Sequence, residues 1–243
     1  MFLRLGAAVI AAALLAAPVA ADEIKQGPRA VLELFTSQGC SSCPEADKLL
    51  VELDKRPDVI ALAYHVDYWD YIGWPDTFGS AEYSDRQRDY ASAWGSSRIF
   101  TPQMVVNGRK GIVASRKSEV DGALGAASLD LEVNLATTAK GMLKVDIPAN
   151  PAVAGEAVVW LVSFIDRADV AIDRGENEGK TIPYVQIVTG RQALGMWEPA
   201  TGASLKLPLA ELVSAPSNGA VILVQQETSG LPGRILGAAS IEN

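Results

Sequence analysis

The sequence predicts an α/β domain followed by an all-β sandwich. An apolar strand at 31–36, a helix at 43–55 and a second apolar strand at 59–66 follow one another, an order that favours a right-handed crossover between parallel strands. From Leu129 onward the chain consists of short runs, several of which alternate apolar with polar residues between Gly, Pro and Asn. This second pattern is typical of a β-sandwich.

Both cysteines of the chain lie in one motif, Cys40-Ser-Ser-Cys43, at the turn between the first strand and the helix. Ser42 and Glu45 predict a capping box, and Pro44 fits the first helical turn, where its missing N–H costs nothing. Unpaired N–H groups and the helix dipole stabilise a thiolate there, which favours a redox or soft-metal role. The alternatives are a structural disulfide, although the loop is too short to stabilise much chain, and half of a zinc site, which lacks a second Cys/His pair.

Cys40 is predicted to be the reactive cysteine. It follows Gln38 and Gly39, so its sulfur is expected to face solvent, whereas Cys43 should be covered by the helix and the sheet. No Lys or Arg is close in sequence, so a lowered thiol pKa would have to come from the helix, from hydrogen bonds or from His65.

Residues 1–21 have the pattern of a secretory signal, with Arg4, an apolar run and small residues before a cut after Ala21. An uncleaved membrane anchor is the alternative, although the run is short for a span. A periplasmic or secreted location is therefore expected. The chain has 21 basic and 29 acidic residues and no Lys/Arg-rich stripe, which makes nucleic acid and anionic lipid poor partners.

Two further residues are candidate modulators of the cysteines. His65, the single histidine, ends the second strand and could tune the thiolate or bind a metal; alternatively it is a hydrogen-bonded strand-end residue. Glu33 lies in the first strand and could act as a proton shuttle for the cysteine pair, because burial would raise its pKa toward the value that such a role requires. The alternative, which we prefer, is a solvated or salt-bridged glutamate at the sheet rim.

The segment 67–78 is rich in aromatic and acidic residues, and it predicts either a lid or partner-binding surface near the cysteines or an aromatic plug over the sheet edge. A helix at 80–93 follows. Pro102 then opens a strand, and Asn107-Gly108 turns it into a hairpin. A last helix is expected from Ser118 to about Ala127.

The motif at Cys40–Cys43 and the hairpin opened by Thr101-Pro102 together resemble a thioredoxin-like fold. More closely, Leu34–Asp47, Tyr64–Asp70 and Tyr83–Arg88 resemble the secreted bacterial family called domain of unknown function 1223. This resemblance implies a thioredoxin-like domain and no established substrate. The sequence departs from the thioredoxin pattern at two places. Ser41-Ser42 lies between the cysteines, and an aromatic and helical segment is inserted at 68–95.

By position, the resemblance implies that Cys40 is the nucleophile and Cys43 the resolving thiol. It also implies that Pro102 is a cis-proline facing them, with the Thr101 backbone pairing with a bound peptide. Asp67, in one of the resembling segments, is a further candidate modulator.

The region from Leu129 contains no Cys or His, so we expect it to carry no catalytic residues of its own. Its most polar loop, 174–179, could bind calcium through acidic or amide side chains, but a solvated loop is the preferred interpretation.

The prediction is therefore an exported protein with a signal peptide (1–21), a thioredoxin-like domain (22–127) and a β-sandwich (128–243). Its expected function is thiol–disulfide exchange with protein thiols or disulfides of the cell envelope, without a cofactor. One alternative is a Cu(I) carrier that uses Cys40, Cys43 and either His65 or Met104 as ligands. The other is a partner-binding module without catalysis.

Overall fold

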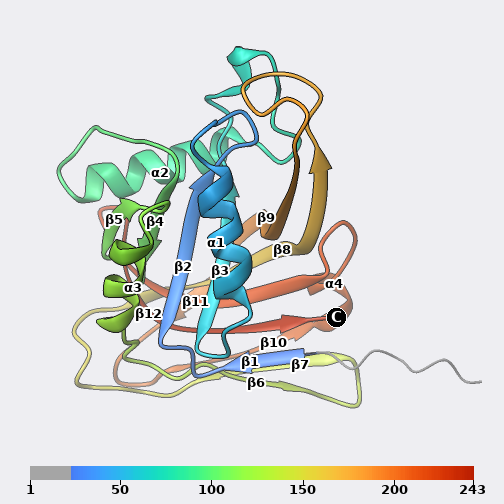
Figure 1. Ribbon diagram of the computed structural model, residues 1–243. Coiled ribbons are helices and arrows are strands. Elements are labelled where there is room, and N and C mark those ends of the chain that lie inside the picture. The colour runs from blue at the N-terminus through green and yellow to red at the C-terminus, as the bar shows by residue number, and fades with distance from the viewer. Residues whose placement is uncertain (1–22) are drawn as a thin grey trace, which may run out of the picture.

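The structure is a computed structural model that describes residues 23–243 (Figure 1). The predicted signal peptide, 1–21, lies outside the described residues. Within the described part, no helix is both long enough and apolar enough to span a bilayer.

Nine strands form one mixed sheet that contains segments from the whole described chain (Figure 1). In spatial order, from one edge to the other, they are β1 (Glu23–Gln26), β12 (Leu231–Glu242), β11 (Gly219–Thr228), β8 (Ala157–Ala171), β9 (Thr181–Trp197), β3 (Val59–His65), β2 (Ala30–Thr36), β4 (Gln103–Val106) and β5 (Lys110–Val113). The pairs β2–β3 and β3–β9 are parallel, and the other neighbours are antiparallel. The predicted parallel pairing of the first two apolar strands is confirmed.

A smaller sheet of three antiparallel strands covers part of the large one. Its order is β10 (Ala203–Pro208), β7 (Met142–Ile147) and β6 (Asn134–Thr137). Apolar side chains of β6 and β7 pack with those of β8, β11 and β12 in one core around the buried Trp197. The short helix α4 (Leu209–Leu212) follows β10.

Helices cover both faces of the β2–β3 region. On one face, α1 (Pro44–Asp54) and α3 (Lys117–Gly125) pack on alternate residues of β2 and β3, such as Leu32 and Ala61. On the other face, α2 (Ala81–Ala93) packs on the residues between them, such as Phe35 and Leu62. Successive side chains of a strand point to opposite faces of the sheet, so alternate residues of β2 and β3 contact different helices. The 3-10 turn η1 (Asp70–Ile72) lies in the loop after β3.

The predicted fold class, a thioredoxin-like α/β domain followed by an all-β sandwich, is wrong. Strands from both sides of residue 127 join in one sheet, and the core under α2 contains side chains from both parts. The joint is the parallel pairing of Ala63 in β3 with Ile187 in β9. Without β9, β3 would be an unpaired edge, and a long apolar edge strand is a template for aggregation. β9 of the same chain pairs with that edge, and the result is a mostly β fold.

Several local predictions are confirmed and others need correction. The β4–β5 hairpin turns at Asn107-Gly108, where both residues have positive φ, as such turns require. β1 was missed because four residues give too little periodicity. β8 and β9 are long, continuous strands, although short runs were expected from Leu129 onward, and their pairing contains register shifts at Val159/Trp160 and Ser163/Phe164.

Candidate functional site

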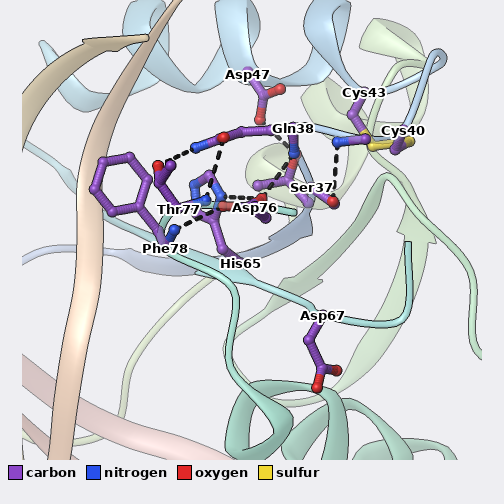
Figure 2. Close-up of polar contacts among 12 residues, drawn as sticks. Ser37, Gln38, Cys40, Cys43, Asp47, His65, Asp67, Asp76, Thr77 and Phe78 are labelled. Carbon is purple, nitrogen blue, oxygen red and sulfur yellow. Dashed lines mark hydrogen bonds and ion pairs between the residues drawn. A yellow bond between two sulfur atoms is a disulfide. The ribbon is translucent and has the colours of Figure 1, made fainter. Parts of the chain in front are cut away.

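The two cysteines form a disulfide at the turn between β2 and α1, with their Cα atoms 5.4 Å apart (Figure 2). Pro44 occupies the first helical turn, as predicted, but the residue that caps the helix is Cys43 and no side chain caps it. The predicted capping box is therefore wrong. The Cys43 N–H donates to the Cys40 carbonyl at 3.2 Å, so the turn is closed by backbone and disulfide together. Ser42 is exposed, and its hydroxyl donates to the Thr101 carbonyl at 3.4 Å.

Both cysteines have no exposed surface, whereas Ser41 and Ser42 between them are exposed. The expectation that the Cys40 sulfur faces solvent is therefore wrong. Sequence neighbours suggested an open site because Gln38 and Gly39 are small or neutral. Segments distant in sequence cover the turn instead. Any attack on the disulfide thus requires a local movement of these segments.

Asn177 is one of the covering residues and comes from the loop between β8 and β9. Its side-chain amide donates to the carbonyls of Gln38 and Cys40, both at 2.9 Å. Asn177 is buried, although Glu176 and Glu178 on either side are exposed. The interpretation of 174–179 as a wholly solvated loop is therefore wrong at this position. No sequence signal marks Asn177, because its partners are 137 and 139 residues away.

The loop after β3 covers the same turn from another side. The Trp74 indole N–H donates to the Gln38 side chain at 2.8 Å. The Trp69 indole donates to the Thr101 hydroxyl at 2.7 Å. A Cβ added to Gly39 would lie 3.2 Å from Trp69 Cβ, so glycine allows this close approach. These tryptophans are packed and hydrogen-bonded, while Tyr71 at the tip of the loop is 83% exposed.

Thr101 and Pro102 lie beside the cysteine turn, held there by the Ser42 and Trp69 hydrogen bonds. The peptide bond between them is cis, which confirms that prediction, and Pro102 is buried. Four residues that the sequence singled out therefore lie in one region of the structure: Cys40, Cys43, Thr101 and Pro102.

Asp47 is a functional candidate that the sequence reasoning missed. It lies one helical turn beyond Cys43 on α1, and its side chain points from α1 toward the sheet (Figure 2). Burial raises its pKa to about 7, although a hydrogen bond from the Thr36 hydroxyl at 2.7 Å favours the ionised form. A carboxyl group that titrates near neutrality suits proton transfer. The signal that could have found it is an acidic residue on the apolar face of an amphipathic helix.

His65 and Asp76 form a second buried pair. His65 Nδ1 lies 2.8 Å from Asp76 Oδ2, and that oxygen also accepts from the Gln38 N–H at 2.7 Å. Burial raises the pKa of Asp76, but the opposing effects of His65 and the N–H donors are larger together and leave it below its usual value. Of the two interpretations of His65, the structure shows the hydrogen-bonded strand-end residue, linked to the cysteine loop through Asp76 and Gln38 (Figure 2).

Three buried polar atoms in this region have no hydrogen-bond partner among the residues that the structure describes: Asp47 Oδ2, His65 Nε2 and the Tyr184 hydroxyl oxygen. The rings of His65 and Tyr184 are in edge contact, with centroids 4.8 Å apart. Buried polar atoms are normally paired with protein or with ordered water. The interior behind the disulfide therefore has free hydrogen-bonding capacity around Asp47.

Glu33 and Asp67 are not part of this site. Glu33 is on the opposite face of β2 and is buried rather than at the sheet rim; it accepts from Arg86 Nε at 3.0 Å and from the Tyr90 hydroxyl. Asp67 lies away from the disulfide and accepts from the Ser84 hydroxyl at 2.5 Å (Figure 2). Neither can modulate the cysteines by direct contact.

The proposed copper ligands are not gathered. Met104 is buried in the apolar core under α1, and His65 Nδ1 is engaged by Asp76. Among residues 23–243, no group of three or more His, Cys, Asp or Glu side chains could hold a metal ion.

Fold and site together define a β-rich protein with a covered Cys-x-x-Cys disulfide at a helix start and a buried carboxyl group one turn beyond it. The chain belongs to the family described as "Protein of unknown function (DUF1223)", whose family model matches residues 31–225. This confirms the resemblance seen in the sequence.

Two solved structures are similar. One is protein AGR_C_4864 from Agrobacterium tumefaciens, at 33% identity and a TM-score of 0.78, covering 89% of this chain and 94% of that one. The other is HBP35 of Porphyromonas gingivalis, at 13% identity and a TM-score of 0.57, covering 88% of this chain and 74% of that one; it shows likeness of fold alone. The search of curated proteins finds no match.

Proposed function

We propose that the protein is an exported thiol–disulfide oxidoreductase that acts on protein thiols or disulfides of the cell envelope through Cys40 and Cys43. The observation that carries the proposal is the Cys40–Cys43 disulfide at the start of α1, with Asp47 buried one turn beyond it. Helix N-termini stabilise thiolates, and a nearby group with a pKa near neutrality can supply or accept the proton of a buried thiol.

In the oxidising direction, a substrate thiolate attacks the Cys40 sulfur. A substrate–Cys40 disulfide forms as the Cys40–Cys43 bond breaks, and the electron pair of that bond goes to Cys43 as a thiolate. Asp47 in its protonated form gives its proton to Cys43. A second substrate thiolate then attacks the substrate sulfur of the mixed disulfide, which releases oxidised substrate and the Cys40 thiolate. The reverse sequence, with Cys40 as nucleophile and Cys43 as resolving thiol, reduces a substrate disulfide.

The covering loops give the proposal a specific requirement. The disulfide has no exposed surface, so the turn at 40–43 must move relative to Asn177 and the two tryptophans before a substrate sulfur can approach. The Thr101 carbonyl, which now accepts from Ser42, is the backbone group beside the cysteines that a substrate peptide could contact after such a movement.

The test compares the protein from Asp22 with the variants Cys40→Ser and Cys43→Ser. The expected result is catalysed formation or reduction of disulfides in an unfolded protein substrate, with equilibration against glutathione. We expect Cys40→Ser to abolish both reactions. We expect Cys43→Ser to accumulate mixed disulfides on Cys40. Ser41→Ala, which changes an exposed residue between the cysteines, is the matched control and should retain activity. If the unaltered protein is no faster than the Cys40→Ser variant in either direction, the proposal fails.

A further inference from the structure

Arg191 on β9 carries a charge that no carboxylate neutralises among the described residues. Its guanidinium stacks on the Trp160 ring of β8 at 3.4 Å from the ring centroid. Within residues 23–243, the guanidinium makes one hydrogen bond, from Nη2 to the Gln225 side chain at 3.2 Å. Among residues 23–243, no Asp or Glu oxygen lies within 4.0 Å of it. Arg191 Nε and Trp160 Nε1 are also buried donors for which the described part of the chain provides no acceptor.

The neighbouring buried groups do not supply the missing charge. Glu33 is the buried carboxylate of this region, and its ion pair is with Arg86. Glu33 therefore pairs with Arg86 and not with Arg191, and the Gln225 side chain accepts from both arginines. Burial and the nearby Arg86 lower the pKa of Arg191 to about 10. A buried charge without a partner of opposite charge lowers the stability of the fold. A bound ligand with a negative group would supply that partner for Arg191.

A cavity of about 460 Å³ opens onto these groups. Arg191, Trp160 and Arg86 line it, and α2 forms one of its sides. Its volume falls within the usual range for small-ligand sites. Because the face of the Arg191 guanidinium is covered by Trp160, its edge is the part left for in-plane hydrogen bonds, the geometry in which arginine binds a carboxylate.

The acidic residues of the cavity restrict the ligand further. Glu82, Asp85, Asp89 and Glu227 also line it. Four carboxylates would repel a simple anion such as phosphate. They would instead attract a cationic group that belongs to the same molecule as the carboxylate.

We propose that this cavity binds a small zwitterion of the amino-acid type, with its carboxylate on Arg191 and its cationic group against the acidic residues. The site lies on the α2 face of the sheet, opposite the face that α1 and Asp47 occupy, and the proposal does not depend on disulfide chemistry.

The test is calorimetric titration of the full mature chain with L-arginine as the probe. Two partial probes accompany it: agmatine, which lacks the carboxylate, and propionate, which lacks the cation. L-arginine should bind, and each partial probe should bind at least about tenfold more weakly, since a charge-assisted hydrogen bond contributes about 1.5–3 kcal/mol.

Arg191→Gln should weaken L-arginine binding at least about tenfold, and Arg116→Gln, an exposed arginine on another surface, should not change it. Because Arg191 is part of a packed network, a second variant, Asp85→Asn with Asp89→Asn, tests the exposed acidic side without touching the core. It should weaken L-arginine binding and should not weaken propionate binding, because it removes negative charge that repels the anion. Absence of L-arginine binding at about 10 mM, equal binding by Arg191→Gln, or propionate binding as tight as L-arginine binding would overturn the proposal.

Discussion

Replacing Asp47 by Asn should stabilise the oxidised protein in a strongly pH-dependent way. In the folded protein the pKa of Asp47 is about 7, compared with an ordinary value of 3.8. The folded state therefore binds the Asp47 proton more tightly than the unfolded state does. Between about pH 4 and pH 7 the folded state holds more protons, so its stability falls as the pH rises through this interval. Above about pH 7, Asp47 is ionised in both states, and the free energy of unfolding is lowered by the full cost of burying the charged carboxylate.

The size of the effect follows from the two pKa values. Their difference of about 3 corresponds to about 4 kcal/mol, at about 1.4 kcal/mol for each tenfold change in proton affinity. The group is only 3% exposed, so solvent screening reduces this little. The asparagine amide of the variant would keep an oxygen for the Thr36 hydroxyl, and the hydrogen bond need not be lost. The expected gain is about 4 kcal/mol at pH 8 and close to zero at pH 4.

Urea unfolding of the oxidised protein and the variant across pH 4–8 measures this difference. Other groups with raised pKa, such as Glu242, affect both proteins alike and cancel in the comparison. Asp121→Asn, at an exposed position on α3, is the control and should give no pH-dependent difference. Parallel stability curves for the unaltered protein and Asp47→Asn would refute the reasoning. The same variant should also slow disulfide reduction if Asp47 supplies the proton to Cys43.

Two further predictions concern hydrogen bonds that cross the sequence. Asn177→Ala removes the donors to the Gln38 and Cys40 carbonyls; at about 1 kcal/mol for each of the two bonds, dithiothreitol should reduce the disulfide about thirtyfold faster, measured by alkylation and mass spectrometry. Glu33→Gln leaves Arg86 buried without a charged partner and should lower the free energy of unfolding by about 3–5 kcal/mol in urea titrations.

Each of these variants has a matched control. Asn150→Ala removes an exposed amide that donates to the Asp130 carbonyl and should leave the reduction rate unchanged. Glu45→Gln changes a glutamate on α1 that has no ion pair among the described residues, and it should alter stability by no more than about 0.5 kcal/mol. An unchanged reduction rate in Asn177→Ala would show that Asn177 does not limit access to the disulfide. A stability loss in Glu33→Gln no larger than in Glu45→Gln would show that the buried ion pair is dispensable.

The sequence predicted the local parts of the site because local rules determine them. Apolar runs, a proline in the first helical turn and an Asn-Gly hairpin placed Cys40, Cys43 and Pro102 on the correct elements. The parts that depend on long-range contacts were not predictable in this way. Asn177 looks like any polar loop residue until its loop is seen over the cysteine turn. Asp47 could have been recognised as an acidic residue on the apolar face of its helix, but its contact with Thr36 and its degree of burial follow only from the packed structure.

The fold class failed for the same physical reason. Periodicity identifies strands but does not say which strands pair, and β3 has two edges to satisfy. One is taken by β2, as the strand–helix–strand pattern predicts. The other is taken by β9, more than 100 residues later, and this pairing merges what the composition suggested were separate units. Glu33 illustrates the same point. Its ion-pair partner, Arg86 on α2, becomes a neighbour only when the sheet is assembled. The same holds for Gln225 on β11, which accepts a hydrogen bond from Arg86.

The pairing of β1 with β12 has a consequence for the order of folding. Glu23 stands opposite Glu242, so the first described strand pairs with the last described strand. The large sheet therefore cannot be completed on a growing chain, and closing this contact spans almost the whole described sequence, which places it late in folding. It also brings the two ends of the described chain together. A circular permutant that joins these ends by a short linker and opens the exposed turn at Lys140–Gly141 would preserve every strand pairing. In that permutant β12 and β1 become neighbours along the chain, and the contact between the two chain ends becomes the pairing of β7 with β6.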